Sequence, residues 1–184
     1  MSSSRNQIDS LYRILRSMIR EEINLTPGFR ELTSCSKLPA NIDAEKTILG
    51  AILLDNTAHS EAAEKLKEDD FSLESHRRIF QRMSELMDAQ KAVDIVTLCE
   101  KMGQQEVKEI GGTAYLASLT EGLPRRLRVA EYTAIMQEKA KLRRIIGACT
   151  EAIKTCQDQR EPASEIVGHL GLALKGIRKT GGTR

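Results

Sequence analysis

Histidine, cysteine and clustered carboxylates are the side chains of this sequence that could bind a metal or act in acid–base catalysis. The three histidines stand apart from one another, and the four cysteines form no C-x-x-C pair. The acidic run Glu68, Asp69 and Asp70 lies in a turn between helical patterns, where solvated carboxylates are common. Asp94 precedes the helical pattern "IVTLCEKM" and is placed to cap it. We therefore expect no catalytic residue, no metal site and no cofactor.

Positive charge is the remaining chemical signal. It is clustered in one stretch, residues 125–144, which contains Arg125, Arg126, Arg128, Lys139, Lys141, Arg143 and Arg144. Phosphate binding needs clustered charge of this kind, but Glu131 and Glu138 interrupt the cluster and the net charge is only +2. Aromatic residues, which would stack on bases, make up 3% of the chain. A solvated helix face is the favoured interpretation, and a nucleic-acid-binding module is an alternative.

The elements that carry these residues are helical. Asn41 is a suitable N-cap for "IDAEKTILGAILLD", and the apolar residues of that segment recur at helical spacing. "SHRRIFQRMSELMDA" has a similar apolar stripe. Gly111 and Gly112 interrupt the pattern, and glycine tolerates the positive φ required where one helix ends and another begins at an angle. The sequence therefore predicts an all-α fold with a corner at the two glycines.

The last third of the chain predicts a helical hairpin. From about Arg128 to about Gln157 there is no proline and only one glycine, so we expect one long helix. Ile135, Leu142, Cys149 and Cys156 recur every seven residues in it, which is typical of a coiled-coil-like seam with the two thiols facing the core. Pro162 then suits the first turn of a second helix. The expected stripe of that helix is Ile166, Val167, Leu170, Leu174 and Ile177.

The N-terminal region differs from the rest. Residues 8–23 form an amphipathic pattern, which "TPG" ends, and residues 29–39 have the composition of a linker. We divide the chain into an N-terminal extension (1–38), a globular helical head (39–124), a long helical hairpin (125–178) and a tail or linker start (179–184). The chain has no secretory signal and no apolar run long enough to cross a membrane, which predicts a cytoplasmic protein.

Five segments resemble the N-terminal domain of the bacterial DnaB-type replicative helicase, in its order and at about its intervals. They are "NIDAEKTILGAILLDN", "HRRIFQRMSEL", "VDIVTLCEKM", "IGGTAYLASL" and "EYTAIMQEKAKLRRII". The resemblance covers about residues 39–178. It implies that hairpins pair between subunits, so that six heads form a trimer-of-dimers collar, and that the collar binds DnaG-type primase. A helicase loader is a further candidate partner, and contact with DNA would be weak or indirect.

The resemblance also implies where partners bind. For primase or another partner it indicates Tyr115, Arg143, Arg144, Ile145, Ile146 and Glu151, with core packing as the alternative for Tyr115. For pairing between subunits it indicates Tyr132, Ile135, Leu142, Cys149 and Ile153. Ile145 and Ile146 are adjacent on a helix and point about 100° apart. We therefore expect one of them to pack into the hairpin and the other to be free to anchor a partner.

The sequence departs from the family at both ends. In the family the second hairpin arm leads to a RecA-type ATPase domain, but no G-x-x-x-x-G-K-[ST] pattern for binding a triphosphate occurs in this sequence. We expect a non-enzymatic chain that assembles helicase subunits and docks primase. The sequence fits either a piece of a full helicase or a free-standing, helicase-interacting regulator, and the N-terminal helix is an addition.

Overall fold

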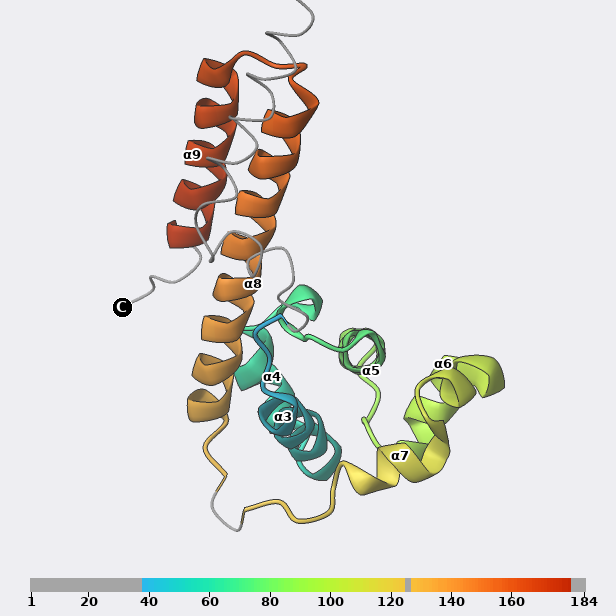
Figure 1. Ribbon diagram of the computed structural model, residues 1–184. Coiled ribbons are helices and arrows are strands. Elements are labelled where there is room, and N and C mark those ends of the chain that lie inside the picture. The colour runs from blue at the N-terminus through green and yellow to red at the C-terminus, as the bar shows by residue number, and fades with distance from the viewer. Residues whose placement is uncertain (1–37, 125–126, 180–184) are drawn as a thin grey trace, which may run out of the picture. The chain divides into compact units, whose positions relative to one another are not determined.

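The computed structural model describes residues 38–124 and 127–179, and within them it contains helices and no strand (Figure 1). The predicted N-terminal helix and linker, Arg125, Arg126 and the last five residues lie outside the described residues. The elements are α3 (Ile42–Leu54), α4 (Thr57–Ala63), η1 (Glu68–Asp70), α5 (Glu74–Asp88), α6 (Ile95–Glu109), α7 (Gly112–Ser118), α8 (Val129–Asp158) and α9 (Ala163–Lys179). The predicted all-α class is confirmed.

The core of the head lies between α3, α5 and the N-terminal half of α8, with α4, α6 and α7 completing it. Its largest fully buried side chains are aliphatic or aromatic, and they come from almost every element of the head. They include Ile48, Leu49, Ile52, Phe71, Ile79, Met83, Leu98, Leu116, Leu119 and Met136. Burial of each such side chain contributes about 1.5–3 kcal/mol.

Local capping explains where the helices of the head begin. The Asn41 side chain accepts a hydrogen bond from the backbone N–H of Ala44 at 3.0 Å, which starts α3. The Asp94 carboxylate accepts from the N–H groups of Val96 and Thr97, both at 2.8 Å, which starts α6. Both caps were predicted and are confirmed, and each contributes about 1 kcal/mol.

Glycine is required at two places in the head. Gly111 and Gly112 have φ angles of 109° and 82°, so the predicted corner between α6 and α7 is confirmed. Gly50 on α3 meets a different need, because a Cβ atom at this position would lie 2.0 Å from the carbonyl oxygen of Leu119. The backbone that follows α7 thus packs directly against α3, and only a residue without a side chain permits that approach.

Helix α8 belongs to both parts of the fold. It is a single helix of 30 residues, about 45 Å long. Its N-terminal half packs on α3, α4 and η1, and its C-terminal half packs along α9 (Figure 1). The head and the hairpin are therefore joined through one continuous helix, and the boundary that we place at residue 124 precedes a helix that serves both.

Candidate partner-docking site

Helix α8 has three faces, which differ in what they contact. Val129, Thr133, Met136 and Ala140 are buried against the head. A second face, about 100° away, lies against α9, and a third face points away from both. We call the third face the outer stripe and define it as Ile135, Leu142, Ile146, Cys149, Ile153 and Cys156. A partner can bind only where side chains remain accessible. The face on which each predicted residue lies therefore decides whether that residue can belong to a docking site.

Two arginines of α8 bind the head instead of pointing to solvent. Arg143 donates to the backbone oxygen of Pro39 at 2.8 Å and to that of Asp70, and Arg144 forms an ion pair with the Asp70 carboxylate. The Asp70 side chain is only 6% exposed. Burial lowers the pKa of Arg143, a shift that nearby Glu45 opposes. We predicted these arginines at the rim of a partner site, and the structure instead places them in the contact that fixes α8 to the head.

The face toward α9 is formed by Lys141, Ile145, Ala148, Ala152 and Thr155, which follow one another at steps of four and three residues. These residues line the space between the two helices together with Leu142 and Glu151 of α8 and with Ile166, Leu170, Leu174 and Ile177 of α9. The predicted seam was placed on the wrong side of α8, because Cys149 and Cys156 are exposed. Alanines, rather than the larger residues of the heptad pattern, allow the close approach of α9.

The outer stripe is therefore an exposed apolar surface, except that Leu142 at its edge also lines the space between α8 and α9. Leu142 is 37% exposed and Ile146 is 39% exposed, values that are high for large aliphatic side chains along a helix. Ile153 is half-buried, while the thiols of Cys149 and Cys156 are open to solvent. Ile145 lines the groove toward α9 and Ile146 lies on the outer stripe, but their side chains are almost equally exposed, at 38% and 39%.

Helix α9 also has a second apolar face. Val167 was predicted in its inner stripe, but it is 71% exposed and lies on the outside, and Leu172 is 68% exposed. Ile166 is buried, as predicted for a residue facing α8. Each helix of the hairpin thus has one apolar face that its partner helix covers and another that remains open.

Tyr115 occupies a polar site inside the head. The Glu45 carboxylate accepts from His76 Nδ1 at 2.7 Å and from the backbone N–H of Ser72 at 2.7 Å. Because a carboxylate can only accept, His76 Nδ1 carries a proton and donates it to this bond, and His76 Nε2 shares a second hydrogen bond with the Tyr115 hydroxyl at 2.5 Å. Burial acts to raise the Glu45 pKa, but the hydrogen bonds from His76 and Ser72 outweigh it and the pKa is lowered.

This chain of hydrogen bonds links α3, α5 and α7. It could not be predicted from the sequence, because 31 residues separate Glu45 from His76. His59 likewise has a polar partner, since its Nε2 lies 2.9 Å from the Ser84 hydroxyl. Glu45 and His76 are buried. Tyr115 itself packs partly on the core, with its pKa raised by burial and by Glu45.

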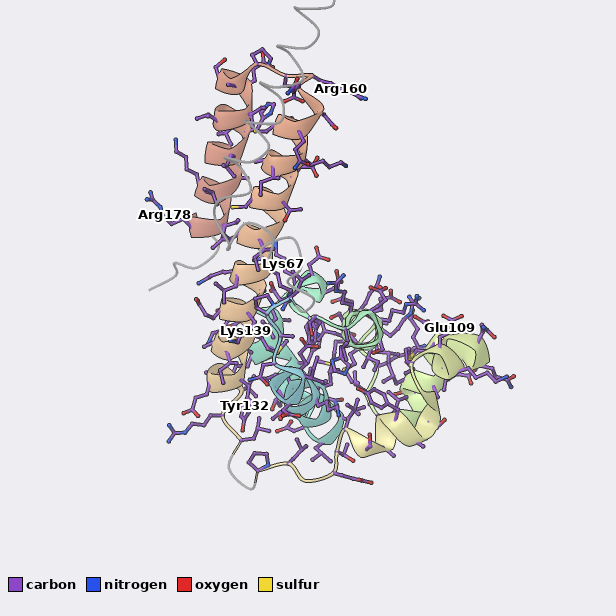
Figure 2. The ribbon with its side chains drawn as sticks, in the orientation of Figure 1. Lys67, Glu109, Tyr132, Lys139, Arg160 and Arg178 are labelled. Atoms are coloured by element: carbon purple, nitrogen blue, oxygen red, sulfur yellow. The ribbon has the colours of Figure 1, made fainter. Side chains whose placement is uncertain are left out.

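The other predicted residues lie on separate surfaces. Tyr132 packs partly against the core of the head, and Glu151 is exposed on the hairpin. In the basic stretch, Arg128 pairs with Glu131 at 3.1 Å, and Lys141 lies 4.0 Å from Glu138. These pairs and the head contacts of the two arginines leave little unpaired charge on the described part of this stretch. Figure 2 shows Lys139 and Tyr132 on the half of α8 beside the head, and Arg160 at the hairpin turn.

The described residues lack the features of a metal site and of a membrane-spanning helix. No group of three or more His, Cys, Asp or Glu within residues 38–124 and 127–179 is placed to hold a metal ion. No helix in the same part of the chain is long and apolar enough to span a membrane.

The family follows from a comparison of the sequence with family profiles. The profile of the DnaB-like helicase N terminal domain matches residues 37–138, more than half of the chain. The chain belongs to this family. The resemblance inferred from its motifs is thereby confirmed, and what matches is the N-terminal domain rather than the ATPase motor.

Relatives of this DnaB-like domain are replicative helicases. The Replicative DNA helicase DnaB of Treponema pallidum is 40% identical over 109 residues, which are 59% of this chain and 25% of that protein. The DnaB of Geobacillus stearothermophilus is 38% identical over 113 residues, 61% of this chain and 25% of that protein. The chain therefore spans about a quarter of the length of the curated relatives that it matches.

Solved structures support the same assignment. The N-terminal domain of DnaB helicase from Mycobacterium tuberculosis has a TM-score of 0.71 and 25% identity, with 76% of this chain and 99% of that one covered. A DnaB-like replicative helicase, solved in a study of its interactions with primase, has a TM-score of 0.61 and 21% identity over 77% of this chain and 32% of that one. At that identity the second likeness establishes the fold alone.

Proposed function

We propose that this DnaB-like domain pairs the subunits of a replicative helicase through its hairpin and docks primase on the paired hairpins. The observation that carries the proposal is the outer stripe, a continuous apolar face along the free half of α8. Its centre lies about 100° around α8 from the face toward α9. Helices of a four-helix bundle contact two neighbours at about this angle, so the hairpin has the form of half a bundle.

The second apolar face of α9 supports the same interpretation. Val167 is 71% exposed and lies about 100° around α9 from Ile166, which faces α8. Monomeric proteins rarely leave contiguous apolar patches of this kind uncovered. A second hairpin would cover the open faces of both helices at once, and pairing of hairpins accordingly explains why the two faces are apolar.

Sedimentation of the whole chain tests the pairing. We expect a dimer, and we expect Leu142→Asp to dissociate it by placing a charge in the interface without a partner. Val96→Asp is the matched control, because Val96 on α6 is 78% exposed and lies away from the hairpin. A strict monomer at high protein concentration, or equal effects of the two substitutions, would contradict the proposed pairing.

Docking of primase rests on membership of the helicase family and on the accessible hairpin. Of the residues that the resemblance indicates for primase, Ile145, Ile146 and Glu151 are exposed there. Ile146 lies on the edge of the outer stripe nearest the head contact of Arg143. We therefore place the primase contact along this edge, with Ile146 as its apolar anchor. Glu151 lies about 140° further around α8, on the side of the groove toward α9. An anchor of this type contributes about 1–3 kcal/mol to binding.

A titration of the helicase-binding domain of the cognate primase tests the docking. Ile146→Ala should weaken binding by about 1–3 kcal/mol and leave the melting temperature nearly unchanged. Ile145→Ala should instead lower stability, by about 1–2 kcal/mol because the site is partly open, and spare the affinity for primase. If the wild-type chain has no affinity for primase but binds single-stranded DNA with a steep salt dependence, the nucleic-acid interpretation replaces this part of the proposal.

A further inference from the structure

Helix α6 is interrupted at Gly103. This residue has φ and ψ angles of 73° and 164°, which lie outside the helical range and which glycine adopts readily. The helix therefore consists of two pieces, residues 95–102 and residues 104–109, joined at one non-helical residue. Gly111 and Gly112 follow the second piece, with φ angles of 109° and 82°. The segment 104–110 thus lies between two points at which glycine lets the backbone turn, and we call it the flap.

The flap has few apolar contacts with the rest of the head. Ile110, its last residue, is buried, and Val107 packs partly against the core. The other residues of the flap are polar, and most of them are exposed. The neighbouring helix α5 contributes five buried residues by comparison. Segments with few buried apolar contacts are those that open locally, without unfolding of the whole domain.

Two ion pairs attach the flap to α5. The Arg78 guanidinium donates to the Glu109 carboxylate at 2.6 Å, and the Arg82 guanidinium donates to the Glu106 carboxylate at 3.1 Å. The two arginines are four residues apart on one face of α5, and the two glutamates are three residues apart on one face of the flap. All four side chains are partly exposed, from 17% to 46%. Ion pairs that water reaches are weak and are screened by salt.

The contact between α5 and the flap is not closely packed. A groove of about 450 Å³ runs between them, and its lining includes both ion pairs, Gln81, Gln105 and Met102. Met102, the last residue before the interruption, is the apolar part of this lining. Charged side chains that reach across the groove therefore hold the flap to α5, since apolar packing there is limited to one end.

The first piece of α6 is held more firmly. Leu98 and Met102 are buried, and the Asp94 cap fixes its start. An ion pair to α5 is present here too, between Lys101 and Glu85 at 2.9 Å. This pair joins the same two helices as the pairs of the flap, but it lies on the other side of Gly103. It therefore supplies a matched control for the role of the interruption.

We propose that the flap is a salt-sensitive latch, which opens as a unit about Gly103 and the glycine pair at 111–112 when its ion pairs to α5 break. The first piece of α6 and the rest of the head keep their positions. Opening frees the guanidinium groups of Arg78 and Arg82 and uncovers Met102. Figure 2 shows Glu109 on the side of the head away from the hairpin, so this device is independent of the pairing and docking proposed above.

Hydrogen exchange of the full chain, followed by NMR at single amides, tests the flap. The amides of Ile110 and Gly111 donate to the carbonyl oxygens of Glu106 and Lys108 and report its opening. After correction for intrinsic rates, we expect them to exchange at least tenfold faster than the amide of Met83 inside α5. Their exchange should depend little on urea, because a local opening exposes little surface. Equal rates with the same steep urea dependence would show that the flap opens only when the head unfolds, and would overturn the proposal.

Three substitutions outside the flap test its attachment without changing its own sequence. Arg78→Gln and Arg82→Gln each remove one ion pair to the flap and should speed exchange of its two reporter amides about two- to fivefold, the range for exposed pairs. Lys101→Gln removes the matched pair on the other side of Gly103 and should leave this exchange unchanged. An equal effect of Lys101→Gln would show that α6 moves as one rigid helix. No effect of either arginine substitution would show that the ion pairs do not hold the flap.

Salt supplies an independent measurement. An increase in sodium chloride from about 0.05 M to about 0.5 M shortens the screening length severalfold and should speed exchange of the flap amides in the wild type about two- to fivefold. The double variant Arg78→Gln/Arg82→Gln should lose this response, because it has no ion pair left to screen. A response that persists in the double variant would contradict the latch.

Discussion

Replacement of Gly50 by alanine tests the packing of the head most directly. The added Cβ atom would lie 2.0 Å from the carbonyl oxygen and 2.8 Å from the carbonyl carbon of Leu119. Both atoms belong to the backbone, so no flexible side chain can move aside. To restore a normal contact, α3 and the segment after α7 must separate by more than 1 Å, in the part of the core where Ile48, Ile52 and Leu116 are buried.

The size of the effect follows from two opposing contributions. Overpacking of a core costs about 1–3 kcal/mol and more where the backbone must shift, so we take the upper end of that range. Alanine favours a helix over glycine by about 1 kcal/mol, which offsets part of the cost. We therefore expect Gly50→Ala to lower the free energy of unfolding by about 2 kcal/mol or more. That corresponds to a fall in the melting temperature of roughly 4–8 °C for a domain of this size.

Gly147 supplies the matched control. It also lies inside a helix, α8, but a Cβ atom there would meet no other atom within 4 Å. Gly147→Ala should therefore raise stability by about 0.5–1 kcal/mol, the helix preference alone. Thermal or urea unfolding of both variants and the wild type, at one protein concentration, measures the two effects. Equal effects of the same sign would refute the close approach of α3 to Leu119.

Two further predictions concern buried charges in the head. Arg144→Ala should lower the free energy of unfolding by about 1.5–3 kcal/mol, the range for a hydrogen bond to a charged group, because the largely buried Asp70 carboxylate loses its ion pair. Asp70→Asn in the same background should recover part of this loss. If it recovers nothing, the ion pair is contradicted. Since the Glu45 pKa is lowered in the folded state, the stability that it contributes is complete above its ordinary value of 4.5 and is lost as the pH falls through the folded-state pKa. The free energy of unfolding, measured from pH 7 down to pH 3, should thus depend less on pH in Glu45→Gln than in the wild type. Identical slopes of this free energy against pH would refute the lowered pKa of Glu45.

Features encoded by neighbouring residues could be predicted from the sequence. The caps at Asn41 and Asp94 depend on contacts within three residues, and the corner at Gly111 and Gly112 depends on a backbone conformation that glycine favours. The bounds of the long helix were also predicted to within one residue, at 128–157 against the observed Val129–Asp158. These local signals were sufficient for the class of fold and for the order of its elements.

The faces of the hairpin could not be assigned in this way. Helix α8 has two stripes that α9 could cover, and the heptad pattern selected the one with the larger residues. The structure places α9 on the other, where Ala148 and Ala152 permit close packing. A periodic pattern reports that a face is apolar but does not say whether the same chain covers it. Contacts between distant segments, such as Glu45 with His76, gave no signal for the same reason.

The head contact of Arg143 and Arg144 divides α8 into a fixed half and a free half, with a mechanical consequence. Gly147 lies one turn beyond the contact and is the one residue of this helix that has no side chain to stiffen it. From Gly147 the helix extends about 17 Å to the hairpin turn. A bend of about 10° there would move the turn by roughly 3 Å while the head stayed still. The free end of the hairpin can thus change direction while the head stays in place, and in the pairing proposed above two hairpins could meet at different angles without deformation of their heads.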